Sequence, residues 1–123
     1  MKVMILMRMS EDHTNAAPPS EADMLAMHNY NEALKAAGIL NEQLMGGLLP
    51  SQFAKRLHFS GKTKNFTVTD GPFTESKEVI AGFALWEVKS MEEAFEWARK
   101  NPVIMDCTVD IRPLYEPGAF DPK

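Results

Sequence analysis

Two segments of this sequence place apolar residues at helical spacing, and each begins with a serine that precedes an acidic residue by three positions. Ser20 is followed by Asp23, and Ser90 is followed by Glu93. This is the pattern of a capping box, in which each side chain accepts a hydrogen bond from the backbone N–H of the other residue. The sequence therefore predicts two helices, and the remaining regular structure must be strand.

The first helix is predicted over residues 21–37, ended by Gly38, and the second helix is ended by Pro102. Five other segments alternate with the period of two that strands have. They are residues 2–9, 54–60, 65–69, 81–89 and 107–116. Residues 41–52 combine a glycine pair with a proline and keep no period, so we predict a connecting loop there; residues 10–20, with two adjacent prolines, are a second predicted loop.

The predicted order of elements is β-α-β-β-β-α-β. We therefore expect an α+β fold, a ferredoxin-like split β-α-β arrangement with an extra hairpin strand. Two helices cover only one face of such a sheet, and an uncovered apolar face usually marks an interface. We expect a homodimer in which two sheets pair face to face and enclose a cavity. The sequence leaves open whether Phe83 and Leu85 or Trp86 and Val88 lie on the uncovered face.

Composition restricts the partners and the location. The length of 123 residues suits one domain, so residues 1–123 are taken as a single unit. A net charge of −4 offers no general attraction for phosphate backbones, so nucleic acid is not an expected partner. The apolar run before Arg8 is too short to cross a bilayer and precedes no cleavage site, so we expect a cytoplasmic protein with no membrane partner. Cys107 is the single cysteine, and no metal or cofactor is expected.

Residues 68–83 read VTDGPFTESKEVIAGF and resemble the signature of the DGPF-motif subfamily of YCII-related domains. Other matches to that family's pattern follow in its usual order: Tyr30-Asn31-Glu32, Lys35-Ala36-Ala37-Gly38, Leu49-Pro50-Ser51, Ser90 with Glu92-Glu93-Ala94, Trp97, and Ile111-Arg112-Pro113. The resemblance covers nearly the whole chain. It implies a ferredoxin-like fold that dimerises through its sheets into an α+β barrel.

The resemblance implies less about chemistry. Members of the wider YCII group carry a histidine in helix one and an aspartate after helix two, a few relatives are linked to dechlorination in aromatic breakdown, and DGPF proteins are often associated with extracytoplasmic-function sigma factors. In this sequence Asn101 stands where the aspartate would precede Pro102, and His28 is about one residue out of register. A neutral amide cannot stabilise a cationic imidazole, which argues against a His-Asp dyad here.

Candidate site residues are polar side chains of the strands, the first helix and the segment 70–78. The catalytic candidates are His58, Asp110 and His28, and the ligand-binding candidates are Asp70, Arg112, Glu87, Glu75, Lys77 and Glu78. A histidine would carry a proton, a carboxylate would be its partner, and an arginine would hold an anionic group. If the hairpin face that carries Arg56 and His58 is turned to the dimer interface, these two residues could meet Glu87, Asp110 and Arg112 there, either to bind a ligand or to pair with one another.

The segment Asp70–Phe73 allows two accounts. In the structural account Asp70 begins a turn by bonding to the backbone, Gly71 takes unusual dihedral angles, Pro72 fixes the next one and Phe73 plugs the core. In the functional account Asp70 and the acidic and basic residues after it line the mouth of the cavity and bind a polar ligand.

Two functions are compatible with these patterns. One is an enzyme or binding protein that takes a small polar or aromatic molecule into a cavity at the dimer interface. The other is a non-catalytic regulatory module that binds an extracytoplasmic-function sigma factor. The sequence contains no Gly-rich phosphate loop, nucleophile elbow or HExxH motif, so no known catalytic pattern decides between them.

Overall fold

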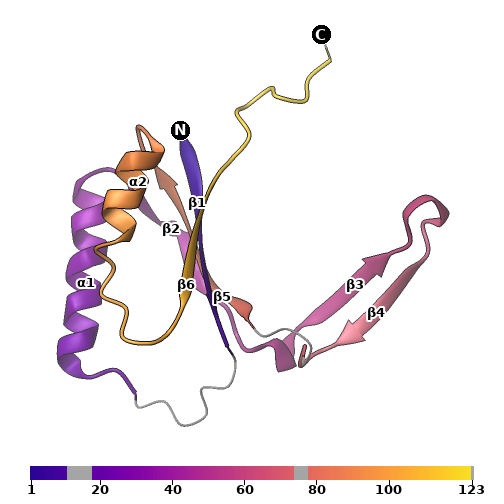
Figure 1. The fold of residues 1–123 in the computed structure, drawn as a ribbon, viewed down its shortest axis with the longest axis horizontal. Helices are drawn as coiled ribbons and strands as arrows, with labels where there is room; N and C mark the ends of the chain where they lie inside the picture. Colours follow the sequence, from indigo (N-terminus) through magenta and orange to yellow (C-terminus); the bar gives the residue numbers. More distant parts are fainter. Residues whose placement is uncertain (11–17, 74–77, 123) are drawn as a thin grey trace.

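The computed structural model describes residues 1–10, 18–73 and 78–122. Its body is a four-stranded antiparallel sheet with both helices on one face (Figure 1). Across the sheet the strands are β2 (Leu40–Gly47), β5 (Val79–Glu87), β1 (Lys2–Met9) and β6 (Thr108–Pro113), and the helices are α1 (Glu21–Ala36) and α2 (Met91–Ala98). The predicted α+β class is confirmed, and so are both helices and the central place of β1.

The core lies between the helices and the sheet. Val3 of β1 and Leu34 of α1 are 0% and 1% exposed, and Trp86 of β5 packs with them. The hydroxyl of Tyr30 on α1 donates a 2.7 Å hydrogen bond to the carbonyl oxygen of Trp97 on α2 and so joins the two helices. Burial raises the pKa of the Tyr30 phenol to about 12.

Both helices begin where the serines predict. At α1 the capping box is complete: the Asp23 N–H donates to Ser20 Oγ at 3.1 Å, and the Ser20 N–H donates to Asp23 Oδ2 at 2.9 Å. At α2 Ser90 accepts from the Glu93 N–H, but the Glu93 carboxylate accepts from the N–H of Lys89 instead of Ser90. The second capping box therefore has one of its two hydrogen bonds, and the other is made with the residue before the serine.

The register of β1 with β5 decides which side chains face away from the helices. Val3 lies opposite Trp86, so Trp86 shares the covered face with the core. Met4 lies opposite Leu85, on the other face. Successive side chains of a strand point to opposite faces, so every second residue of these strands lies on the uncovered face. This open face includes Met4, Leu6, Arg8, Phe83, Leu85, Glu87, Asp110 and Arg112.

The predicted loop over residues 41–52 is wrong in its first half, because residues 40–47 form the edge strand β2. Leu40 pairs with Trp86 and Met45 pairs with Ala84, so four residues of β2 stand against a single residue, Leu85, between the two partners on β5. Such an irregularity breaks the alternation from which a strand is recognised. The observed order is therefore β-α-β-β-β-β-α-β, one strand more than predicted.

The predicted hairpin is confirmed as β3 (Lys55–Phe59) paired with β4 (Phe66–Asp70). It does not join the main sheet, however, but forms a separate two-stranded sheet. It projects from the body on the side opposite the helices (Figure 1). We call residues 55–70 the arm. Neither described helix has the length and apolar character that a membrane crossing needs.

Candidate functional site

The arm is joined to the body by a tight junction between Ser51 and the segment Asp70–Phe73. The Gly71 N–H donates to the Ala54 carbonyl oxygen at 2.9 Å, and the Phe73 N–H donates to Ser51 Oγ at 3.0 Å. Ser51 is 6% exposed. A Cβ at Gly71 would overlap the carbonyl oxygen of Ser51, so no residue but glycine fits without a backbone shift. The junction therefore requires glycine because of this close approach, and not because of the unusual dihedral angles that were predicted, since the φ of Gly71 is not positive.

The two end residues of this segment, Asp70 and Phe73, do not take the positions that the structural account predicts. Asp70 is exposed at the end of β4, and its Oδ1 lies 3.7 Å from Nζ of Lys55 across the arm. Phe73 is half-buried and lies outside the buried core cluster. The guanidinium carbon of Arg56 lies 3.9 Å from the centroid of the Phe73 ring. The prediction that Phe73 plugs the core is therefore wrong, because its ring packs against a cation at the base of the arm.

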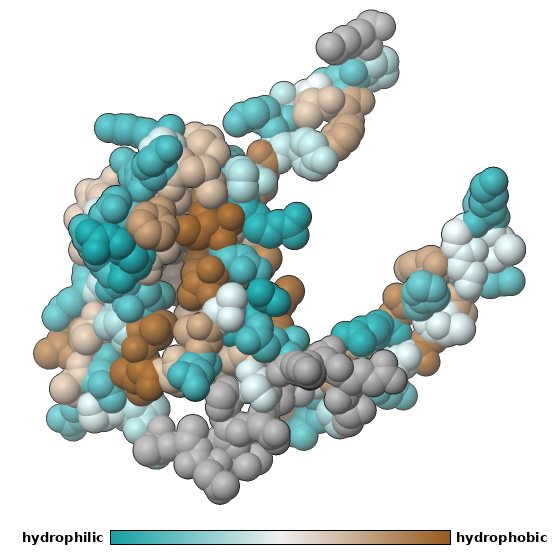
Figure 2. Space-filling model, in the orientation of Figure 1, coloured by the Kyte–Doolittle hydropathy of each residue, from teal (hydrophilic) through white to brown (hydrophobic). Residues whose placement is uncertain are grey.

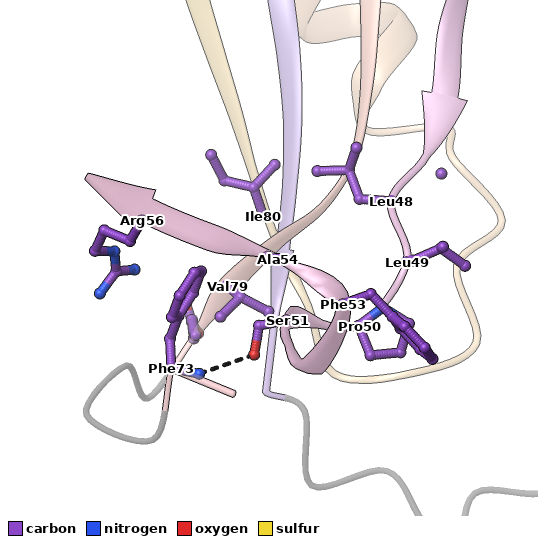
Figure 3. Close-up of a pocket in the computed structure, with 12 residues that line it drawn as sticks. Leu48, Leu49, Pro50, Ser51, Phe53, Ala54, Arg56, Phe73, Val79 and Ile80 are labelled. Atoms are coloured by element: carbon purple, nitrogen blue, oxygen red, sulfur yellow. Dashed lines mark hydrogen bonds between the residues drawn. The ribbon is translucent and has the colours of Figure 1, made fainter. Parts of the chain in front are cut away.

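A pocket of about 580 Å³ opens beside this junction. Its wall is mostly apolar, and among the described residues Arg56 and Glu78 are the charged ones that line it. In Figure 3 the Arg56 guanidinium lies over the Phe73 ring on one side, while Leu48, Leu49 and Phe53 lie on the other. Small-molecule sites usually have about 300–1,000 Å³ and combine apolar walls with a few polar groups. The pocket has the size and composition of such a site.

A charged cluster adjoins the pocket on the open face. Nε of Arg8 lies 3.0 Å from Oδ2 of Asp110, and Nη1 of Arg8 lies 3.6 Å from Oε2 of Glu78. The Thr108 hydroxyl donates to Oε1 of Glu78 at 3.4 Å. Glu78 belongs to both the cluster and the pocket. The acidic groups near the pocket are therefore partly neutralised by Arg8.

Some of the predicted residues lie together and others do not. Asp110 and Glu78 meet at Arg8, and Arg112 lies two residues from Asp110 on the same face of β6. Glu87 is at the far end of β5, where Oε1 lies 3.7 Å from the N-terminal ammonium group. Glu78, Asp110 and Arg112 are therefore the predicted candidates that lie nearest the pocket on the open face.

The remaining candidates are elsewhere. His58 and Asp70 are on the arm, and His28 is exposed on α1. Within one chain Arg56 and His58 share no sheet face with Glu87, Asp110 and Arg112, because the arm pairs apart from the main sheet. Their meeting at a dimer interface stays a prediction. Glu75, Lys77 and most of the predicted loop over residues 10–20 lie outside the described residues.

Sequence reasoning missed two residues that organise the site, Arg8 and Ser51. Arg8 carried a usable signal: it follows Met4 and Leu6 on one side of a strand predicted to be central, where a cation needs an anionic neighbour. Ser51 carried a weaker one, as the end of the Leu49-Pro50-Ser51 match. Its bond to Phe73 joins residues 22 positions apart, which no local pattern reveals.

The possible metal ligands and the single cysteine also bear on the chemistry. Among the described residues no three His, Cys, Asp or Glu side chains lie close enough together to hold a metal ion. Partial burial, with smaller contributions from the charges of Asp106 and Glu78, raises the pKa of the Cys107 thiol. Cys107 therefore stays protonated at neutral pH, which fits a packing role better than that of a nucleophile.

Comparison with known proteins gives a family match and one curated relative. Residues 1–117 match the YCII-related domain. The uncharacterized protein R00369 of Rhizobium meliloti (strain 1021) is 40% identical to this chain in an alignment of 78 residues, and the match covers 59% of this chain. The chain thus spans about 60% of the length of that relative. The name of the relative states no activity, so the chemistry has to be argued from the pocket.

Proposed function

The chain belongs to the YCII-related domain family, and from this premise we propose that it binds a small molecule with an apolar or aromatic body and an anionic group. The observation that carries the proposal is the position of Arg56. Its guanidinium is stacked on Phe73 at the wall of an otherwise largely apolar pocket of about 580 Å³. This places a fixed positive charge beside an apolar space.

The chemistry of the guanidinium supports an anionic ligand. Stacking on an aromatic ring uses the flat face of the guanidinium and leaves the N–H groups at its edge available. These groups match a carboxylate in a two-bond geometry. Leu48, Phe53 and Ile80 would receive the apolar part of the same molecule. A small aromatic carboxylate satisfies both requirements.

His58 is the first proton carrier to test. It lies two residues after Arg56 on the same face of β3, about 7 Å along the strand. An anion held by Arg56 would therefore lie near its imidazole. Asp110 is paired with Arg8 and His28 lies on α1, so neither shares that position. If the ligand is transformed, we propose that His58, in preference to His28 or Asp110, carries the proton.

We also propose that the protein is a homodimer of the DGPF type that pairs its sheets into an α+β barrel. The order β2-β5-β1-β6, with all pairs antiparallel, is the order expected for a ferredoxin-like split β-α-β sheet and supports that finer assignment. Neither helix covers the open face, which includes Phe83 at 38% exposure. A two-fold related copy would cover it and would enclose the pocket.

A thermal-shift screen of small aromatic carboxylates tests the binding proposal. A ligand at one hundred times its Kd stabilises the folded state by about 2.7 kcal/mol, which raises Tm measurably. We expect stabilisation that Arg56→Gln abolishes and Arg112→Gln preserves, because Arg112 lies outside the pocket lining. Stabilisation that is lost in Arg112→Gln and kept in Arg56→Gln would move the anion site to β6. No stabilisation by any compound would count against the proposal.

The alternative is a regulatory interaction module for an extracytoplasmic-function sigma factor. It draws support from the apolar side chains that the arm exposes, such as Phe59 at 63%. Pull-down with the purified chain from its host would enrich a sigma factor in this case, and would lose it with Phe59→Ser. Enrichment of no sigma factor would remove the alternative and leave the small-molecule proposal standing.

A further inference from the structure

The arm has two unlike faces. Its register places Leu57 opposite Val68 and Phe59 opposite Phe66, and both pairs lie on one face. The rings of Phe59 and Phe66 are 5.8 Å apart between centroids. The other face is polar and carries His58. The arm is therefore amphipathic, although none of the other strands that the structure describes pairs with it.

The apolar face of the arm is not covered by any described residue of its own chain. The exposed fractions of its four side chains run from 48% at Leu57 to 63% at Phe59. A two-stranded hairpin alone is only marginally stable in water, and a patch of apolar side chains rimmed by polar ones marks an interaction site. The arm points away from the body (Figure 1), so the body of the same chain does not reach this face.

Charge identifies the kind of surface that the arm fits. The arm holds four Lys and Arg residues and one Asp, which gives a net charge of +3. The whole chain holds 13 basic and 17 acidic residues, so the rest of the chain holds nine basic and sixteen acidic residues and has a net charge of −7. Opposite charges on arm and body favour the approach of the arm of one copy to the body of another.

The open face offers the matching apolar surface. It carries Phe83 and Leu85 of β5 beside Met4 and Leu6 of β1. Figure 2 shows that the arm and the C-terminal segment project from the body with a wide hollow between them. A contact in which the arm of each copy lies on the body of the other is made twice about a two-fold axis, as a symmetric dimer requires.

We infer that the apolar face of each arm docks on the open face of a second copy of the chain, so that the binding pocket of each copy is walled in part by the other. Ile80 of the pocket and Phe83 of the open face belong to the same strand. An arm that packs on the open face would therefore also reach the edge of the pocket. The inference rests on the proposed homodimer and deepens it by naming the segment that makes the contact.

Sedimentation equilibrium of the full chain tests the contribution of the arm. Phe59→Ser/Phe66→Ser removes both rings of the apolar face, and His58→Ser/Thr67→Ser is the matched control on the polar face of the same strands. We expect the dissociation constant of the dimer to rise by at least about tenfold in the first variant and to change little in the control. Circular dichroism should show that both variants keep the fold, because all four positions are exposed.

A cysteine pair tests where the arm docks. In a Cys107→Ser background, one chain carries Phe59→Cys on the arm and the other carries Phe83→Cys on the open face. We expect oxidation of the mixture to give a disulfide heterodimer in higher yield than a mixture of Thr67→Cys with Phe83→Cys, because Thr67 lies on the polar face of the arm.

The outcomes separate this inference from the proposed dimer. A wild-type dimer that Phe59→Ser/Phe66→Ser leaves equally tight would overturn the arm contact and would leave the dimer intact. A wild-type chain that is monomeric at micromolar concentration would overturn both the dimer and the arm contact, and would indicate that the arm binds a different protein. Equal cross-linking from Thr67→Cys and Phe59→Cys would overturn the assigned face of the arm.

Discussion

The main sheet and the arm are both built from antiparallel strands, but only the main sheet has a core. Trp86 on β5 is 3% exposed, whereas Phe66 on β4 is 56% exposed. Both residues lie in segments that alternate between two faces. The difference is that α1 and α2 cover one face of the main sheet and neither covers the arm (Figure 1). Alternation predicts that a segment is a strand, and the elements that pack on it decide how much of it is buried.

The same comparison applies to the two faces of the main sheet. On β1 Val3 is fully buried against the helices, while Met4, its neighbour in sequence, is only half-buried on the open face. The chain therefore has a core on one side of the sheet and two incompletely covered surfaces on the other, the open face and the arm. Changes in these regions should have different effects.

The largest effect is expected inside the core. Leu34→Ala removes a side chain that is 1% exposed, so the free energy of unfolding should fall by about 2–5 kcal/mol. Leu57→Ala, at 48% exposure on the arm, should cost less than about 1 kcal/mol where the chain is monomeric. Urea denaturation at low protein concentration measures both. Equal losses would contradict the contrast between core and arm.

The next effect is expected at the junction. Gly71→Ala would press a Cβ into the Ser51 carbonyl and should cost about 1–3 kcal/mol of unfolding free energy. Gly47→Ala is the control, because its Cβ would meet only the Ala81 carbonyl oxygen, at 4.0 Å. The same urea experiment compares them. If Gly71→Ala proves as mild as Gly47→Ala, the arm is not held at this close approach.

The core should also respond to alkaline pH. The pKa of Tyr30 is raised from 10.0 to about 12 in the folded state, so the unfolded state loses its proton first. The contribution of Tyr30 to the free energy of unfolding is therefore fully present below pH 10 and is lost as the pH rises from 10 to 12. Tyr30→Phe should have a flatter profile over this range. Parallel profiles for the two proteins, measured by urea unfolding at each pH, would contradict the burial of the phenol.

The smallest effect is expected at the charged cluster of the open face. The Arg8 and Asp110 side chains are 39% and 37% exposed, so water screens their attraction. A double-mutant cycle with Arg8→Ala and Asp110→Ala should give a coupling of at most about 1 kcal/mol, which salt reduces. In a dimer that covers this face the coupling should grow, because the pair loses water. A coupling that is unchanged between monomer and dimer would place the cluster outside the interface.

The fold could be predicted from the sequence where the signals are local. Ser20 and Ser90 each start a helix, and the Leu57 and Val68 segments form a hairpin. Local signals failed at β2, where the irregular pairing between Leu40 and Met45 hides the alternation. They also failed at the arm, because no short pattern reports that β3 and β4 pair only with each other.

The candidate site was harder to predict, because its parts come from distant segments. Asp110 and Glu78 were candidates, but Arg8, which holds both, lies about a hundred residues before Asp110. Arg56 was one of the residues that could meet at a dimer interface, and no local pattern indicated that its guanidinium lies over the Phe73 ring. The residue types suggested anion binding, which stays a prediction, and only the junction between arm and body shows which arginine lines the pocket.

The junction at Ala54 and Gly71 also bears on how this chain varies during evolution. The 2.9 Å bond between them means that residues 55–70 leave the body and return to it at nearly the same point. Insertions and deletions are tolerated at exposed segments whose ends are close and whose backbone is not needed by the core. We therefore expect relatives to lengthen, shorten or recharge the arm while the core residues stay the same, so that the arm can change without a loss of fold stability.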